Sequence, residues 1–291
     1  MGLDVRTAGD AVPPSGLDRV RHTAARSASR AGSIPARSVG TIGRGVLLAG
    51  AVLKFTARDL VSLRLPVGEL LVQAWMLLKV TATPAMLMAV PIGAVVSVQV
   101  GGLVNQLGAS SLVGAASGFG VIRQGAPMVT GFLMGGVAAA AIASDLGARQ
   151  VREELDALKV MGVDPVRRLV VPRFLALVLI APLLCCVIIA SAVSASYLIA
   201  VGVNGITPGS FWMSFGSFAK VLDVWFALGK SIVFGAIVGI ISSLRGMEAR
   251  RGPRGVADAV NSAVVLSVVC IVIANVTITQ LQTMFFPAEV S

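Results

Sequence analysis

Five long apolar segments alternate with polar connections along this chain. They cover about residues 84–107, 118–143, 169–201, 224–244 and 256–286. A helix needs roughly 20 mainly apolar residues to cross the hydrocarbon core of a membrane, where the backbone must also satisfy its own hydrogen bonds. The pattern therefore predicts an all-α polytopic membrane protein with five transmembrane helices.

The chain before the first span has two different patterns. Residues 1–45 are rich in Arg, Ala, Ser, Gly and Pro and have no sustained apolar period, which predicts a disordered cytoplasmic leader. The leader has no apolar core followed by a cleavage site, so a secretory signal peptide is not expected. Residues 46–83 form an interfacial region, in which an amphipathic helix at about 65–80 places Trp75 and Lys79 at the headgroup level. The transmembrane domain is expected at 84–291.

A charged segment lies between the second and third spans, at residues 145–162. One helical face carries the apolar residues Ala148, Val151, Leu155 and Leu158. The other carries Arg149, Arg152, Glu153 and Asp156.

Asp145 suits the start of this helix, and Gly162 with Asp164 and Pro165 suits its end. The residues alone leave two interpretations open, a handle for a soluble partner or a solubilising loop.

The distribution of positive charge predicts the orientation of the chain in the membrane. Ten basic residues lie in two loops, at 145–173 and 245–255, whereas the opposite side has little beyond Lys220. Because cytoplasmic loops are enriched in Lys and Arg, both loops and the N-terminus are expected in the cytoplasm, with the C-terminus outside. Hydrophobic residues make up 56% of the chain and charged residues 13%. This composition excludes an ordinary soluble domain, and the scattered basic residues disfavour nucleic-acid binding despite the net charge of +10.

Few side chains of the spans suit catalysis or metal binding. The one histidine, His22, lies in the leader, and Cys185, Cys186 and Cys270 lie in apolar runs without metal-ligand spacing. The chain has no Gly-x-x-x-x-Gly-Lys-Ser/Thr phosphate-binding loop. We therefore expect neither an enzyme nor a metal or cofactor site in this chain.

Polar residues inside the spans are candidates for contact with a lipid. Ionisable groups at membrane depth are costly, and polar ones there either line a cavity or bond between helices. The candidate lipid-pocket residues are Gln99, Gln106, Arg123, Gln124, Asn275, Thr279 and Gln282. Lys230 lies seven residues after Asp223, and we expect it to have a partner carboxylate or to reach toward the headgroups. Small residues at four-residue spacing predict close helix packing at Gly131, Gly135, Gly235 and Gly239.

The charged segment resembles the signature of the MlaE/YrbE permeases, the membrane subunits of Mce-type ABC lipid transporters. The matching runs are SDLGAR at 144–149, EELDAL at 153–158 and MGVDP at 161–165. The similarity extends to Gly125-x-Pro127 upstream and to VPR at 171–173, LGKS at 228–231 and the run at 252–265 downstream. It covers about residues 65–285. Two departures from the commoner pattern are Gln124, where many relatives carry Glu, and Leu244, where many carry Cys.

The resemblance implies an assembly and a function. It implies a dimer of permease chains in the cell membrane (the inner membrane) of a bacterium, with two copies of a cytoplasmic ATPase that hold ATP and Mg. It also implies an MCE-domain partner that carries lipid across the space outside this membrane. The form of the signature is more similar to an A-type YrbE chain, which pairs with a B-type chain; the alternative is a homodimer. The coupling helix against the ATPase is implied to comprise Arg149, Arg152, Glu153, Glu154, Asp156, Leu158 and Met161.

Two other functions are compatible with a five-span membrane protein. An ATP-independent lipid carrier or channel would favour intramembrane carboxylates and internal repeats, and we find neither in the spans. A non-transporting membrane scaffold would associate poorly with an ATPase. The lipid itself stays open between phospholipid, fatty or mycolic acid, and sterol.

Overall fold

The computed structural model describes residues 43–58, 67–106, 108 and 112–285 of the chain. The expectations for the leader before residue 43, His22 included, and for residues 65–66 lie outside this part. The chain divides into two units, with the boundary between Leu47 and Leu48. A helix covers residues 43–58, and all other helices named below belong to the second unit.

Five long apolar helical segments confirm the predicted fold class. The candidate spans are Gly68–Val104, Val113–Val151, Val166–Gly202, Val221–Met247 and Pro253–Phe285. The described residues contain no strand. Length and hydropathy were thus sufficient to predict the number of spans, because a membrane admits few alternatives to apolar helices of this length.

The first span is part of one long helix, α2 (Val67–Gln106), which contains Pro84 and Pro91. The sequence pattern placed a boundary between an interfacial helix and a span at residue 84, and the structure has no break there. Proline keeps a helix-compatible φ, and transmembrane helices tolerate its missing N–H. At about 1.5 Å per residue this helix is about 60 Å long, so it extends well beyond a hydrocarbon core of about 30 Å.

The second span is a series of α-helical and π-helical segments. Its segments are α3 (Val113–Phe119), η2 (Gly120–Gly125), α4 (Ala126–Leu133), η3 (Met134–Ala138) and α5 (Ala139–Val151). It is the most buried of the five spans. Two small residues allow α10 to come close, because a Cβ on Gly131 or Gly135 would lie 2.6 or 2.9 Å from Ile271. The predicted interruption near Arg123 corresponds to the π-helical turn η2.

The remaining helices complete the bundle. They are η4 (Val166–Val170), α7 (Val171–Gly202), α8 (Pro208–Phe218), α9 (Val221–Met247) and α10 (Pro253–Phe285). Helix α7 packs most extensively along α2, and α9 contacts α5, α7 and α10. Small residues again permit close contact: a Cβ on Gly235 would lie 3.0 Å from the carbonyl oxygen of Leu177, and one on Gly239 would lie 3.1 Å from the Phe174 ring.

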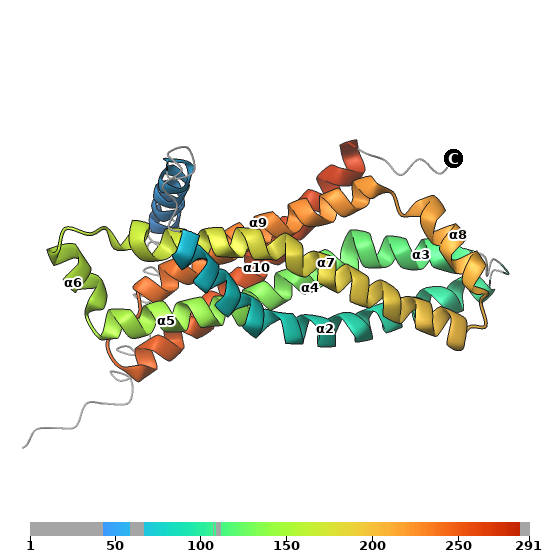
Figure 1. Cartoon of the computed structure of the whole chain (residues 1–291), viewed down its shortest axis with the longest axis horizontal. Coiled ribbons are helices and arrows are strands. Elements are labelled where there is room, and N and C mark those ends of the chain that lie inside the picture. Colours follow the sequence, from blue (N-terminus) through green and yellow to red (C-terminus); the bar gives the residue numbers. More distant parts are fainter. Residues whose placement is uncertain (1–42, 59–66, 107, 109–111, 286–291) are drawn as a thin grey trace, which may run out of the picture. The chain divides into compact units, whose positions relative to one another are not determined.

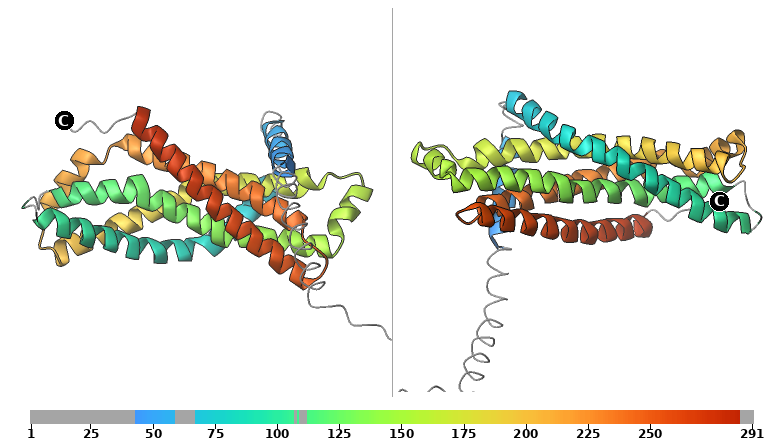
Figure 2. Two further views of the ribbon diagram at one scale, coloured as in Figure 1. Left: turned by 180° about the vertical axis from the view of Figure 1, so that it is seen from behind. Right: turned by 90° about the horizontal axis from the view of Figure 1, so that it is seen from below.

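Helices α2 and α10 lie on opposite faces of the bundle, with the second span between them (Figure 2). These two spans bury the smallest share of their surface. Their exposed side chains are largely aliphatic, as at Leu87, Val95, Val98, Val269, Val272 and Val276. Such faces suit lipid tails or a second membrane helix.

The charged segment does not form the single helix that its periodicity predicted. Helix α5 continues the second span to Val151, the chain turns at Arg152 and Glu153, and a short helix α6 (Glu154–Val160) follows. Asp145 therefore lies inside α5 and does not face a helix N-terminus, which corrects the predicted start. The break occurs because Glu153 has a left-handed backbone, with φ of 60°.

The predicted end of the charged segment is confirmed. Gly162 follows α6 with φ of +75°, a conformation that glycine adopts without steric cost. The N–H of Val163 donates to the carbonyl of Leu158, and the N–H of Gly162 donates to that of Lys159. These two bonds form a Schellman motif, which fixes the direction in which the chain leaves α6.

Candidate functional site

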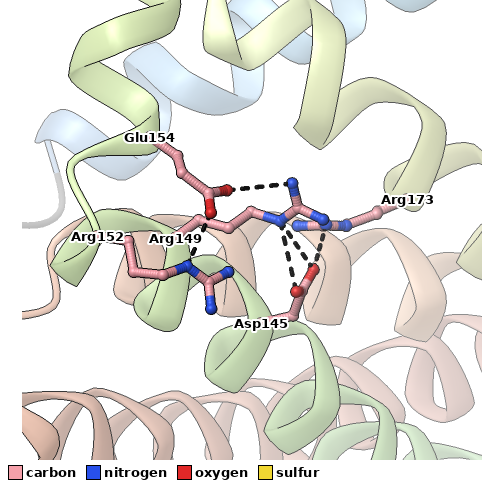
Figure 3. Close-up of polar contacts among 5 residues, drawn as sticks. All are labelled: Asp145, Arg149, Arg152, Glu154 and Arg173. Carbon is pink, nitrogen blue, oxygen red and sulfur yellow. Dashed lines mark hydrogen bonds and ion pairs between the residues drawn. The ribbon is translucent and has the colours of Figure 1, made fainter.

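An ion-pair network joins α5 and α7 beside the turn that leads into α6. The carboxylate of Asp145 accepts hydrogen bonds from Arg173 Nη2 and, at 3.4 Å, from Arg149 Nε. Figure 3 shows both guanidinium groups converging on this carboxylate. The Arg173 side chain is only 2% exposed, and a buried cation requires an anion beside it. Asp145 therefore fixes Arg173, and with it the start of α7, to the end of the second span.

The same network continues to α6. The carboxylate of Glu154 pairs with Arg149 at 3.5 Å and with Arg152 at 2.7 Å (Figure 3). On the other side of the turn, Glu153 pairs with Arg251, from the loop before α10, at 3.2 Å. The apolar side of α6 carries Leu155, which is buried in the core of the bundle. Helix α6 is thus attached to the bundle by Leu155, by the partly buried Leu158 and by ion pairs on both sides.

The other side of α6 is exposed. Val160 is 89% exposed and Met161 68%, and none of the described residues covers them. An exposed ion pair between Asp156 and Lys159, 2.9 Å apart, lies beside them. An apolar surface with a charged rim is typical of a protein-docking site. We call the residues of α5, its turn and α6 from 145 to 163 the charged hairpin.

The predicted coupling residues divide between the two sides of this hairpin. Arg152, Glu153, Asp156 and Met161 are exposed. Arg149, Glu154 and Leu158 are partly buried, and the first two belong to the ion-pair network. Sequence periodicity had placed Arg149 on the outward face, whereas in the structure it is turned toward Asp145 and Glu154.

A second polar site lies inside the spans, where η2, α9 and α10 meet. Pro127 has no N–H to donate to the carbonyl of Arg123, its α-helical acceptor four residues earlier. The ammonium of Lys230, on α9, donates to that carbonyl at 3.3 Å. It also donates to the hydroxyl of Thr279, on α10, at 3.0 Å. The proline and the lysine together explain why the helix can be interrupted at this depth.

Asp223 links the same three elements through its carboxylate, and it lies within the candidate span Val221–Met247, so the expectation of spans without a carboxylate was wrong. Its Oδ1 atom lies 3.4 Å from Arg123 Nε and accepts a hydrogen bond of 3.3 Å from Gln282 Nε2. The guanidinium of Arg123 also lies over the ring of Phe119, 4.9 Å from its centroid. We call Arg123, Asp223, Lys230, Thr279 and Gln282 the membrane cluster.

The structure brings together some of the predicted lipid-pocket residues and separates others. Arg123, Thr279 and Gln282 belong to the membrane cluster, and the backbone carbonyl of Asn275 accepts a hydrogen bond from the Thr279 hydroxyl. Gln99, Gln106 and Gln124 are exposed and lie outside the cluster. Sequence reasoning left Asp223 and Lys230 out of the pocket. The signal that could have included them is their seven-residue spacing on one face of a span.

A groove of about 570 Å³ lies elsewhere, between α2 and α7. Its lining is almost wholly apolar and includes Met86, Val90, Ala190 and Leu198. None of the predicted lipid-pocket residues lines it. Among the residues that the structure describes, no group of three or more His, Cys, Asp or Glu side chains is placed to hold a metal ion.

Comparisons with known proteins agree on one family. The family model described as "Permease MlaE" matches residues 70–281. The chain is 33% identical to a probable ABC transporter permease protein of Synechocystis sp., over 63% of this chain and 70% of that relative. It is 29% identical to the intermembrane phospholipid transport system permease protein MlaE of Haemophilus influenzae, over 60% of this chain and 67% of that relative. It is also 33% identical to the chloroplastic protein TRIGALACTOSYLDIACYLGLYCEROL 1 of Arabidopsis thaliana, over 59% of this chain and about half, 49%, of that protein.

Proposed function

We propose a function from the fact that this chain belongs to the MlaE family of ABC transporter permeases. It moves lipid between the cell membrane and an MCE-domain shuttle. A separate cytoplasmic ATPase pair supplies the energy and holds ATP and Mg. The charged hairpin couples that ATPase to the spans. The protein works as one chain of a permease dimer, with a B-type paralogue as its partner.

The observation that carries this proposal is the construction of the charged hairpin. Its outer side presents Val160 and Met161 to a partner. Its inner side is tied to the bundle through Glu154, Arg149 and Asp145. A ligand or partner shifts a conformational equilibrium only through contacts that differ between the two states. A helix that is exposed on one side and fixed on the other transmits such a difference to the spans.

Other features support the remaining parts of the assembly. The exposed aliphatic faces of α2 and α10 suit a second permease chain and the surrounding lipid tails. The basic residues beside the charged hairpin favour its location in the cytoplasm, where the ATPase would be. A relative that matches this chain over 175 residues is named for intermembrane phospholipid transport, which favours phospholipid as the class of lipid.

A first experiment tests the assembly. The complex is purified from membranes in mild detergent through a tag on this chain, and its proteins and retained lipids are identified by mass spectrometry. We expect an ATPase, a second permease chain and MCE-domain proteins. Recovery of this chain without an ATPase, under several mild conditions, would favour an ATP-independent carrier or a scaffold instead.

A second experiment tests the charged hairpin by the double substitution Glu153→Ala with Asp156→Ala. We expect lipid transfer per ATP hydrolysed to fall at least about tenfold, the equivalent of roughly 1.4 kcal/mol of lost coupling, because two outward carboxylates are removed. The variant should stay in the membrane. Arg251→Ala is the matched control, since it breaks the ion pair of Glu153 and keeps the carboxylate. Unchanged transfer and unchanged lipid-dependent ATP hydrolysis in the double variant would count heavily against a coupling role.

A further inference from the structure

We propose that α8 is an interfacial helix, which lies in the headgroup layer of the leaflet opposite the charged hairpin and inserts Trp212 and Met213 among the lipids. Figure 1 shows α8 and α6 at opposite ends of the bundle. The 11 residues of α8 cover about 16 Å at about 1.5 Å per residue, which is too short to cross a membrane. This inference goes beyond the proposed function, because the lipid in contact with α8 belongs to the surrounding bilayer and is not the transported molecule.

The depth of α8 follows from the lengths of the two spans that it connects. Arg173 and Arg245 mark the ends of these spans near the charged hairpin. Tyr197 lies 24 residues after Arg173, about 36 Å along α7, and Trp225 lies 20 residues before Arg245, about 30 Å along α9. The hydrocarbon core is about 30 Å thick, and the headgroup layers extend the membrane to about 40–45 Å. Both aromatic residues, and α8 between them, therefore lie at the headgroup level of the opposite leaflet.

The composition of α8 favours lipid over water. The sequence has no Asp, Glu, Lys or Arg between Arg173 and Lys220, so α8 and the turn before it are free of charged residues. About a quarter of the residues of soluble domains are charged. The outward side of α8 carries Trp212, which is 50% exposed, and Met213, which is 80% exposed. Lys220 follows α8 directly, and a cation at this level can meet the phosphates of the headgroups. Tryptophan beside a cation is typical of the membrane interface.

The inward side of α8 is fixed to the bundle. It packs along α3 (Figure 1), where a Cβ on Gly118 would lie 2.8 Å from the Phe215 ring. The ring of Tyr197, on α7, has its centroid 5.5 Å from that of Trp212. These contacts hold the Trp212 indole at one depth relative to two spans, while half of its surface stays open.

The hydroxyl groups of α8 are compatible with an apolar environment. Ser214 donates to the carbonyl of Ser210, and Ser217 donates to that of Ser214. Serine hydroxyls that bond to the backbone of their own helix need no water as a partner. The side of α8 that faces the lipid is thus free of charge and its Ser217 hydroxyl is satisfied within the helix.

The experiment measures the depth of Trp212 by fluorescence quenching in the full chain, reconstituted in phosphatidylcholine vesicles. The chain has three tryptophans, so Trp75→Phe with Trp225→Phe leaves the indole of Trp212 alone. The three quenchers are phosphatidylcholine brominated near the top of its chains, phosphatidylcholine brominated near their ends, and iodide on both sides of the membrane. We expect the shallow bromine to lower the emission about twofold and more than the deep bromine, and iodide to have little effect, as for an indole at the headgroup boundary.

Matched variants calibrate this measurement. With all three tryptophans replaced by Phe, Val160→Trp places an indole at a position that is 89% exposed on the charged hairpin, where iodide should quench it and the brominated lipids should not. In the chain that keeps Trp212, Met213→Asp should weaken the quenching by shallow bromine and shift the emission to longer wavelength, because a carboxylate is unfavourable among lipid chains. Met213→Leu should change neither.

Three results would overturn the proposal. Iodide quenching of Trp212 as strong as that of Val160→Trp, without an effect of brominated lipid, would assign the outward side of α8 to water and favour a protein partner there. Protection of Trp212 from all three quenchers would show that another chain covers it. Stronger quenching by the deep bromine than by the shallow one would place α8 in the hydrocarbon core.

Discussion

Two cationic side chains, Arg173 and Lys230, are almost completely buried, and their surroundings differ. Arg173 is only 2% exposed and has a carboxylate partner in Asp145. Lys230 donates to a carbonyl and a hydroxyl, and the described residues form no ion pair with it. The first arrangement fixes structure, because both charges are compensated within the chain. The second fixes the π-helical turn, because the ammonium donates to the Arg123 carbonyl, which lacks an N–H donor at Pro127.

The Asp145–Arg173 pair gives a prediction about stability. Asp145→Asn leaves the buried guanidinium of Arg173 without its main anion, so we expect the free energy of unfolding to fall by about 2 kcal/mol. This value is below the range for fully buried pairs, because Asp145 is partly exposed. The double variant with Arg173→Met should recover part of this loss, since no unpaired charge remains. Unfolding of the purified protein in detergent measures both. A double variant less stable than Asp145→Asn alone would contradict this account.

Single residues also show what the sequence predicts and what it does not. Arg123, Thr279 and Gln282 stand out in the sequence because polar side chains in apolar spans are costly. Helical periodicity states which residues share a face of one helix, but it does not state which helix lies opposite. The meeting of α9 and α10 at Asp223 therefore had to come from the structure.

Among the elements, the charged hairpin departs most from its sequence pattern. Apolar residues at helical spacing continue across residues 148–158, so the pattern favours one helix. The break depends on Glu153, whose left-handed conformation is rare for a residue with a side chain and carries no sequence signal. The end of α6 was predictable because it uses Gly162, a residue typical of that position.

The left-handed residue gives a prediction about this element. Both Glu153→Gly and Glu153→Ala lose the exposed ion pair with Arg251, which contributes little. Only glycine adopts the left-handed conformation without steric cost, so we expect the glycine variant to be about 1 kcal/mol more stable than the alanine variant. Chemical or thermal unfolding in detergent compares the two. An alanine variant of equal stability would show that this turn relaxes when Glu153 is replaced.

For the molecule as a whole, the five spans were predictable and their assembly was not. Length and hydropathy determine which segments suit a membrane. Nothing in one sequence states whether the aliphatic faces of α2 and α10 meet lipid or a second chain, because both surroundings are apolar. The orientation rests on the distribution of Lys and Arg and belongs to the same scale.

That orientation gives a prediction from cysteine labelling. In a variant with Cys185, Cys186 and Cys270 replaced by Ala, a single cysteine is placed at Val160 or at Thr207, both exposed. A membrane-impermeant maleimide should label Val160→Cys only from the cytoplasmic side and Thr207→Cys only from the other side. The cysteine-free protein is the control. Labelling of both positions from one side would contradict the five-span topology.

The π-helical turn η3 has a consequence for how the second span can move. It lies between Arg123 in the membrane cluster and Arg149 in the charged hairpin, so the two sites occupy the ends of one helical rod. A π-helical turn holds one more residue than an α-helical turn, and each residue of an α-helix accounts for about 100° of rotation. Conversion of η3 to α-helix would therefore twist one end of the rod relative to the other. The second span can thus transmit torsion as well as displacement. Spin labels on either side of η3 test this: if the second span moved only as a rigid body, the orientation of one label relative to the other would not change with ATP.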